Sequence, residues 1–141
     1  MISKEEVLDR CNSRKKGTLM ETLDITFIDV EFEDQSITAK MPVTTAVHQP
    51  DGVLHGGATA ALIETVGSVA VFVFKQSENL LVRGIEISAN HLKSIREGDV
   101  FATAKPVHLG RTTQHWEIKV TDKEGALISV GKLLTITLEK K

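Results

Sequence analysis

The chain contains one long apolar run, residues 58–74, which a single carboxylate, Glu64, interrupts near its centre. A helix of this composition is apolar nearly all round, so neighbouring structure has to enclose it. An ionised carboxylate in such surroundings is costly unless a nearby group compensates for it. Perturbed carboxylates of this kind gather at functional sites. Glu64 is therefore the first candidate for a functional residue.

The rest of the chain predicts one antiparallel sheet beside this helix. Ser3 and Glu6 have the spacing of a capping box, which predicts a short helix over about 3–13. Apolar periodicity predicts the other elements: strands over 23–32 and 36–41, a helix over 57–74, and strands over about 80–95, 99–108, 112–121 and 126–138, with residues 75–79 as a connection. One helix that is apolar on all sides requires a curved sheet that wraps most of it. The remaining part needs a further cover, and the simplest cover is a second subunit.

Length and composition limit the classes of protein. The 141 residues predict a single α+β domain over 1–141, and the formal charge of −2 gives no field that would attract nucleic acid. Cys11 is the only cysteine, so the chain has no internal disulfide and we expect a reducing, cytoplasmic location. Residues 1–6 are acidic and lack an apolar stretch, so we expect no signal peptide. The 58–74 run is shorter than the roughly 20 residues of a membrane span, and we expect no membrane association.

Small residues surround Glu64 on its predicted helix face. At helical spacings of three and four, Gly57, Ala61, Glu64 and Ser68 fall on one stripe. Small side chains leave space beside the carboxylate for a substrate or another backbone. The preceding Gly56 and Gly57 give unencumbered N–H groups at the positive end of the helix, where they could polarise a carbonyl. These parts favour attack on a carbonyl or thioester carbon, with Glu64 as general base or nucleophile.

Each of these residues also has a simpler interpretation. Glu64 could be an interface residue that pairs with a basic group of a partner. His55 could be catalytic, or its ring could bond the backbone where the helix begins. Ser68 could touch a ligand or a water held by Glu64, or it could be a small packing residue bonded back to its own helix.

Several common kinds of site are absent from the sequence. The five histidines lack the helical spacing of a zinc enzyme, and there is no cysteine pair. There is no Gly-x-Ser-x-Gly motif and no phosphate-binding loop. We therefore expect neither a metal nor a cofactor. Cys11 lies in the predicted first helix, and a lone thiol there is expected to be inert.

Three segments carry a resemblance to a known family. Residues 49–68, which include the motif Leu54-His-Gly-Gly57 and Glu64, together with residues 84–93 and 105–110, resemble the hotdog-fold acyl-CoA thioesterases. The similar branch includes phenylacetate-type, 4-hydroxybenzoyl-CoA and 1,4-dihydroxy-2-naphthoyl-CoA thioesterases. The likeness runs through nearly the whole chain and ends near Leu134.

The resemblance implies a hotdog fold, in which a curved antiparallel sheet wraps a long central helix. It implies a homodimer with active sites shared between subunits, and dimers that join into homotetramers. By position, Glu64 is the catalytic carboxylate, and the N–H groups of Gly56 and Gly57 polarise the thioester carbonyl. Gln49 and His55 assist at that carbonyl or orient the attack. Ser68 lies near Glu64 and its water, and His91 lines the pocket.

The implied substrate is an acyl-CoA thioester, either an aroyl-CoA or one with a short or medium acyl chain. Coenzyme A is then part of the substrate rather than a cofactor. Its phosphates need cationic and hydroxyl groups. The positions that match this need are Lys93, Arg111, Thr112, Thr113 and Lys132. Each could equally be a solvated surface residue, and for Lys132 we favour that interpretation.

Two other functions remain open from the sequence. A hotdog enoyl-thioester hydratase or dehydratase would use an acid and a histidine, and His48 or His55 could serve. A non-catalytic acyl-CoA binding module would keep the phosphate contacts without needing Glu64. The Gly-Gly pair before the helix and the position of Glu64 follow the thioesterase pattern and favour thioester hydrolysis over the hydratase.

Overall fold

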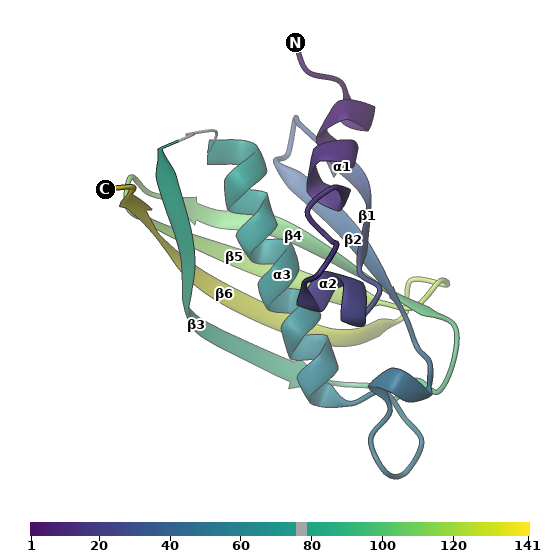
Figure 1. The fold of residues 1–141 in the computed structure, drawn as a ribbon. Helices are drawn as coiled ribbons and strands as arrows, with labels where there is room; N and C mark the ends of the chain where they lie inside the picture. Colours follow the sequence, from purple (N-terminus) through teal and green to yellow (C-terminus); the bar gives the residue numbers. More distant parts are fainter. Residues whose placement is uncertain (76–78) are drawn as a thin grey trace.

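The elements follow the predicted order along the chain in the computed structural model, which describes residues 1–75 and 79–141 (Figure 1). The bounds are α1 (Lys4–Asn12), α2 (Leu19–Thr22), β1 (Thr26–Glu31), β2 (Ser36–Pro42), the 3-10 helix η1 (Thr45–Val47), α3 (Gly56–Lys75), β3 (Leu80–His91), β4 (Asp99–Leu109), β5 (Thr113–Thr121) and β6 (Leu127–Glu139). The predicted long helix, short N-terminal helix and antiparallel sheet are confirmed. Residues 76–78, within the predicted connection 75–79, lie outside the described part. Helices α2 and η1 were not predicted, because four and three residues are too few to show a period.

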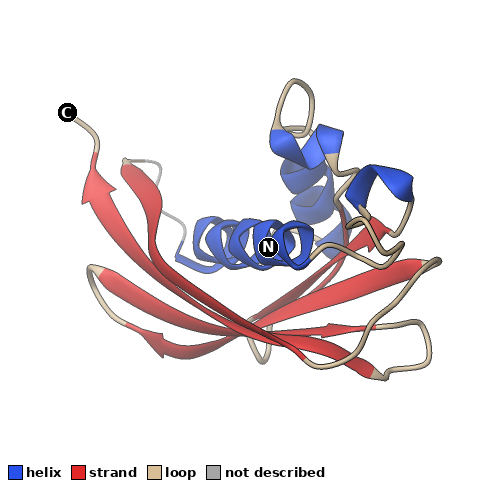
Figure 2. Cartoon of the chain, turned by 90° about the horizontal axis from the view of Figure 1, so that it is seen from below, coloured by secondary structure: helices blue, strands red, loops and turns tan. Residues whose placement is uncertain are grey.

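All six strands form one antiparallel sheet in the order β1-β2-β4-β5-β6-β3. The sheet is curved, and α3 lies in its concave side (Figure 2). Because β3 comes last in this order, it pairs with β6 on one side only. Among residues 1–75 and 79–141, no strand pairs with its other edge, which we call the open edge of β3.

The buried side of α3 packs closely on the sheet because two glycines remove side chains at the contact. A Cβ on Gly67 of α3 would lie 2.5 Å from Leu133, and a Cβ on Gly131 of β6 would lie 2.7 Å from Ile63. Leu62, Ile63 and Val66 are fully buried there. Burying a side chain of this size contributes about 1.5–3 kcal/mol. By length and hydropathy alone α3 would also qualify as a membrane span, but its apolar face is the core of this sheet.

Part of α3 lies outside the cover of the sheet, as expected for a helix that needs a further cover. Glu64 is exposed there, and Phe72 is 41% exposed beneath the guanidinium of Arg14. The expectation that Glu64 is buried is therefore wrong for the single subunit. The periodicity could not reveal this, because apolar residues also occupy the side of α3 that faces away from the sheet.

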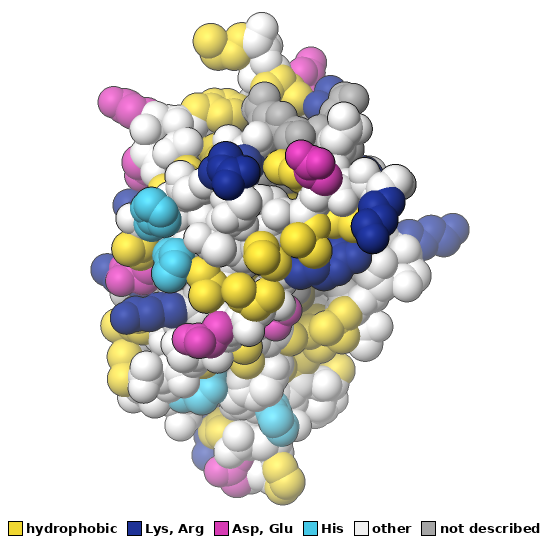
Figure 3. All heavy atoms as spheres, turned by 90° about the vertical axis from the view of Figure 1, so that its left-hand side faces the viewer, with side chains coloured by type: hydrophobic (Ala, Val, Ile, Leu, Met, Phe, Trp, Pro, Cys, Tyr) yellow, Lys and Arg dark blue, Asp and Glu magenta, His cyan; other side chains and the backbone are white. Residues whose placement is uncertain are grey.

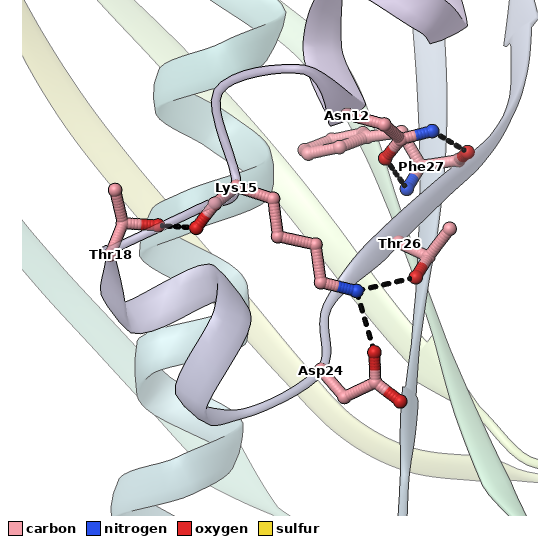
Figure 4. A network of polar contacts seen from close by, with 6 residues as sticks. All are labelled: Asn12, Lys15, Thr18, Asp24, Thr26 and Phe27. Carbon is pink, nitrogen blue, oxygen red and sulfur yellow. Dashed lines mark hydrogen bonds and ion pairs between the residues drawn. The ribbon is translucent and has the colours of Figure 1, made fainter.

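The N-terminal segment is fastened to β1 by polar contacts (Figure 4). The predicted capping box at Ser3 is present. The Asn12 amide donates to the Phe27 carbonyl at 3.0 Å and accepts from the Phe27 N–H at 2.8 Å. Lys15 donates to the Asp24 carboxylate at 2.5 Å and to the Thr26 hydroxyl at 3.0 Å. Together these contacts fix the position of α2, which lies close to the beginning of α3.

Candidate active site

Helix α3 begins at a histidine and two glycines whose N–H groups differ in their bonding. The Gly57 N–H donates to Nδ1 of His55 at 2.8 Å, and the N–H groups of Ala58 and Thr59 donate to the His55 carbonyl. Among the described residues, the Gly56 N–H has no hydrogen-bond partner. The His55 ring therefore bonds the backbone where the helix begins, as the simpler interpretation held. The donor left free at this positive helix end belongs to Gly56 rather than Gly57.

A pocket of about 270 Å³ opens at Gly56 and brings four predicted site residues together. We call it the Gly56 pocket. It is lined by Gln49, Val53, Leu54, Gly56, Thr59, His91, Leu92, Lys93, Ser94, Ile95 and Ile128. The Gln49 amide donates to the carboxylate of Asp51 at 2.9 Å, which holds the side chain at the rim. This pocket therefore combines a free backbone donor with polar side chains from the ends of β3 and the loop before α3.

The imidazole of His91 is fixed between β6 and the start of α3. His91 pairs directly with Ser129 across the two strands, and its Nδ1 lies 2.5 Å from the Ser129 hydroxyl. Its Nε2 faces Gly56 so closely that a Cβ on Gly56 would come within 2.7 Å. Only glycine leaves room for this ring at the start of the helix. Ser129 could not be recognised from the sequence, because contacts across a sheet depend on strand register.

A second pocket lies on the other side of the first turn of α3. This Gly57 pocket, of about 290 Å³, is lined by Leu19, Leu23, Ala46, Val47, His48, His55, Gly57, Ala58 and Ala61. Most of these side chains are apolar, and the two leucines come from α2 and from the residue that follows it. The small residues Gly57 and Ala61 belong to the stripe that also carries Glu64. The pocket therefore occupies space of the kind that the sequence predicted beside that stripe.

Glu64 itself is not part of either pocket. Its carboxylate lies against β3, where a Cβ on Gly84 would come within 2.9 Å of Oε2. Glu64 lies eight positions after Gly56, which is about 12 Å along a helix. A glutamate side chain cannot span that distance. Ser68 follows one turn later on the same stripe and is half-buried.

The predicted coenzyme A contacts do not lie together in one subunit. Lys93 lines the Gly56 pocket, and its Nζ lies 3.9 Å from the Asp122 carboxylate. Residues 111–113 lie at the opposite end of α3, where Lys75 donates to the carbonyls of Gly110 and Arg111. Lys132 lies between Gly131 and Leu133, both of which are buried against α3, so it points to the opposite face of the sheet.

No metal site accompanies these pockets in the part of the chain that the structure describes. There, no three His, Cys, Asp or Glu side chains gather closely enough to hold an ion. The polar groups available for chemistry are therefore the Gly56 N–H, the rings of His55 and His91, the Gln49 amide and the Glu64 carboxylate.

Comparisons with known proteins agree that the chain is similar to thioesterases. A family model described as the thioesterase superfamily matches residues 51–129. The 1,4-dihydroxy-2-naphthoyl-CoA hydrolase of Escherichia coli is 40% identical over 98% of this chain and 100% of its own. The proofreading thioesterase EntH of Cronobacter sakazakii is 40% identical over 93% of each chain. The structure of a mutant thioesterase from Pseudomonas aeruginosa matches with a TM-score of 0.89 and 36% identity, over 94% of each chain.

Proposed function

The chain belongs to the thioesterase superfamily, and on this premise we propose that it hydrolyses an aroyl-CoA at sites shared between two subunits. It is a hotdog-fold thioester hydrolase. The observation that carries the proposal is the Gly56 N–H, a donor without a partner among the described residues, which opens on a pocket beside His91. There the N–H can donate a hydrogen bond to the thioester carbonyl oxygen. Gln49 lies at the rim of the same pocket and can orient the substrate.

The reacting carboxylate has to come from a second subunit. Within one chain, about 12 Å of helix separates Gly56 from Glu64. The edge of β3 away from β6 offers the place for a partner, because Ile85 and Ile87 of this strand are exposed. Apolar side chains also form a band on the side of the molecule that Figure 3 shows. Two β3 strands paired antiparallel about a two-fold axis place the beginning of one strand beside the end of the other. Glu64 lies near the beginning, at Gly84, and the Gly56 pocket lies near the end, at His91.

Such pairing completes two identical sites. Glu64 of each subunit approaches the Gly56 pocket of the other, where the partner also covers the exposed side of α3. Burial between the two helices then supplies the apolar surroundings that the single subunit lacks. Ser68, one turn from Glu64, lies close enough to hold a water beside the carboxylate. We also propose that dimers join into tetramers.

Two chemical routes fit this arrangement. In the first, Glu64 takes a proton from water as the water oxygen attacks the thioester carbon. The C–S bond then breaks, and the thiolate of coenzyme A receives that proton. In the second, the Glu64 carboxylate attacks the carbon directly and releases the thiolate, and water then hydrolyses the mixed anhydride. The Gly56 N–H stabilises the oxyanion that forms in both routes.

The two pockets suggest how the substrate lies across the start of α3. The apolar Gly57 pocket suits the acyl group, and its size and lining favour an aromatic ring. Lys93 lies on the side of the Gly56 pocket, where it suits a phosphate of coenzyme A. The same two-fold axis brings Arg111 of the partner subunit towards this end of the sheet, along with its Thr112 and Thr113. Lys132 has no part in this arrangement and is a surface residue.

A soluble acyl-CoA substrate and a single cysteine favour a cytoplasmic location.

The hydratase alternative has less support. Nε2 of His48 lies 2.8 Å from the Arg96 carbonyl, so it donates there, and Nδ1 of His55 accepts from Gly57. Each histidine therefore already uses one ring nitrogen to hold the backbone. Neither ring lines the Gly56 pocket beside the free donor.

The direct test follows thiol release from benzoyl-CoA and 1,4-dihydroxy-2-naphthoyl-CoA. Glu64→Gln keeps the shape of the side chain but is neither basic nor nucleophilic, so we expect near-complete loss of kcat with substrate binding retained. Unchanged turnover in this variant would remove the catalytic assignment and favour a binding module. A single turnover in water labelled with heavy oxygen distinguishes the routes, because only direct attack transfers the label to Glu64.

A further inference from the structure

We propose that Nε2–H of His91 is the second donor to the thioester carbonyl oxygen, and that Ser129 is a positioning residue that keeps the proton on that nitrogen. The proposal rests on the proposed function, because it assigns another donor to the same Gly56 pocket. It differs from the general expectation that His91 lines the pocket, since it names the atom, the tautomer and the residue that determines the tautomer.

The contact between His91 and Ser129 is direct and buried on the serine side. The two residues form a cross-strand pair between β3 and β6, and Nδ1 lies 2.5 Å from the Ser129 hydroxyl oxygen. Ser129 is 0% exposed. Among the described residues, the His91 ring is the one hydrogen-bond partner of this hydroxyl. The Ser129 hydroxyl therefore has one hydrogen-bond partner among the described residues, and that partner is Nδ1 of His91.

The direction of this hydrogen bond follows from counting donors. A serine hydroxyl carries its own proton, and a neutral imidazole has one nitrogen that donates and one that accepts. If Nδ1 carried the proton, it would donate to Ser129, and the Ser129 proton would be buried without an acceptor. A buried donor without an acceptor loses its hydrogen bonds to water and gains none in return, which destabilises that arrangement. The hydroxyl therefore donates to Nδ1, and the ring proton of His91 resides on Nε2.

The position of Nε2 then makes that proton useful. The ring abuts the first residue of α3, since a Cβ on Gly56 would stand 2.7 Å from Nε2. Both groups line the same pocket, together with Gln49 and Lys93. The Gly56 N–H and the His91 Nε2–H are thus neighbouring donors. A tetrahedral oxyanion is commonly held by two such donors, and removing one costs about 10²–10³-fold in kcat.

The two histidines at this helix end consequently have opposite roles. His55 accepts from the Gly57 N–H through Nδ1, which fixes the backbone. His91 has its Nδ1 occupied by Ser129, so Nε2 remains to donate to a substrate. This division explains why a donor beyond Gly56 would come from His91 although His55 lies closer in sequence.

The tautomer can be measured without any reaction. The imidazole nitrogens of the full-length protein are followed by long-range proton–nitrogen NMR at a pH where His91 is neutral. We expect the Nε2 resonance of His91 at a protonated-nitrogen position and Nδ1 at an unprotonated one. A wild-type protein with the proton on Nδ1 would overturn the proposal, whatever its thioesterase activity.

A matched pair of variants tests the role of Ser129. Ser129→Thr and Ser129→Val have nearly the same shape and impose the same crowding in the strand, but only threonine keeps the hydroxyl. We expect the threonine variant to keep the Nε2–H tautomer, and the valine variant to lose the preference and about tenfold in kcat with KM little changed. Equal spectra and equal kcat for the two variants would show that Ser129 only fills space.

The donor role of His91 is tested separately, by removing its ring. We expect His91→Ala to lower kcat about 10²–10³-fold. If the tautomer is as proposed but His91→Ala keeps its kcat, the second donor lies elsewhere and the assignment fails. Failure of the proposed function is distinguishable, because it would appear as full activity in Glu64→Gln and would leave the NMR result unaffected.

Discussion

The Glu64 carboxylate of α3 lies directly on the backbone of Gly84 in β3, where a Cβ would come within 2.9 Å of Oε2. This contact joins the catalytic candidate to the strand at the open edge of the sheet. A bulge between Gly84 and Glu86 interrupts the β3–β6 ladder at the same point. The missing side chain at Gly84 is therefore what gives the Glu64 carboxylate its place against the sheet.

Gly84→Ala is predicted to separate activity from stability. The added methyl group displaces the carboxylate, and we expect kcat to fall about tenfold. Alanine also restricts the unfolded strand more than glycine, which favours the folded state by roughly 0.5–1 kcal/mol. Steady-state kinetics and thermal unfolding measure the two effects. Ser88→Ala, on the face of β3 away from α3, is the matched control, and an equal loss of kcat in both variants would contradict this account.

Ile87→Asp is predicted to abolish activity by separating the subunits. Ile87 is 37% exposed on β3, and a carboxylate buried there by a partner would be left without compensation. Analytical ultracentrifugation is expected to show monomers, and thiol release is expected to disappear. Val107→Asp, on β4 at a position 69% exposed, is expected to retain the dimer. An active, monomeric Ile87→Asp protein would be incompatible with shared sites.

Ala58→Leu is predicted to change substrate preference. Ala58 lines the apolar Gly57 pocket, and a leucine there reduces the space for a ring. Kinetics with a panel of CoA esters would show a KM about tenfold higher for naphthoyl and benzoyl esters, whereas acetyl-CoA is little affected. A uniform loss across the panel would indicate that the acyl group binds elsewhere.

Cys11 is predicted to be unreactive in the folded protein. It is only 3% exposed, and burial raises the pKa of its thiol to about 11. At pH 8 the thiol is therefore protonated, and the thiolate is the reactive form. A thiol reagent should label the native protein far more slowly than the unfolded one. Rapid labelling without unfolding would show that the packing of α1 on the core is loose.

The features that the sequence predicted correctly are local ones. The apolar run of α3, the alternation in the strands and the capping box at Ser3 are each encoded within a few neighbouring residues. The exposure of Glu64 could not be predicted from its neighbours in the sequence. A helix that is apolar all round does not reveal whether its own sheet or a second subunit covers the side that carries the carboxylate.

Two details of the site depend on contacts between distant residues. Nothing in the sequence distinguishes the N–H groups of Gly56 and Gly57. In the structure, the ring of His55 accepts from the Gly57 N–H and leaves the Gly56 N–H free among the described residues. Similarly, Ser129 is an ordinary strand residue until the register of β3 against β6 places it opposite His91. Neither could be predicted before the strands and the start of the helix were placed in space.

Mixing two inactive variants shows whether each site takes Glu64 from one subunit and Gly56 from the other. Gly56→Val fills the space beside His91, and Glu64→Gln removes the carboxylate. After the two proteins are dissociated and refolded together, half of the dimers are mixed, and each mixed dimer has one intact site. We predict recovery of about a quarter of the wild-type activity. A mixture that stays as inactive as its two components would contradict this arrangement.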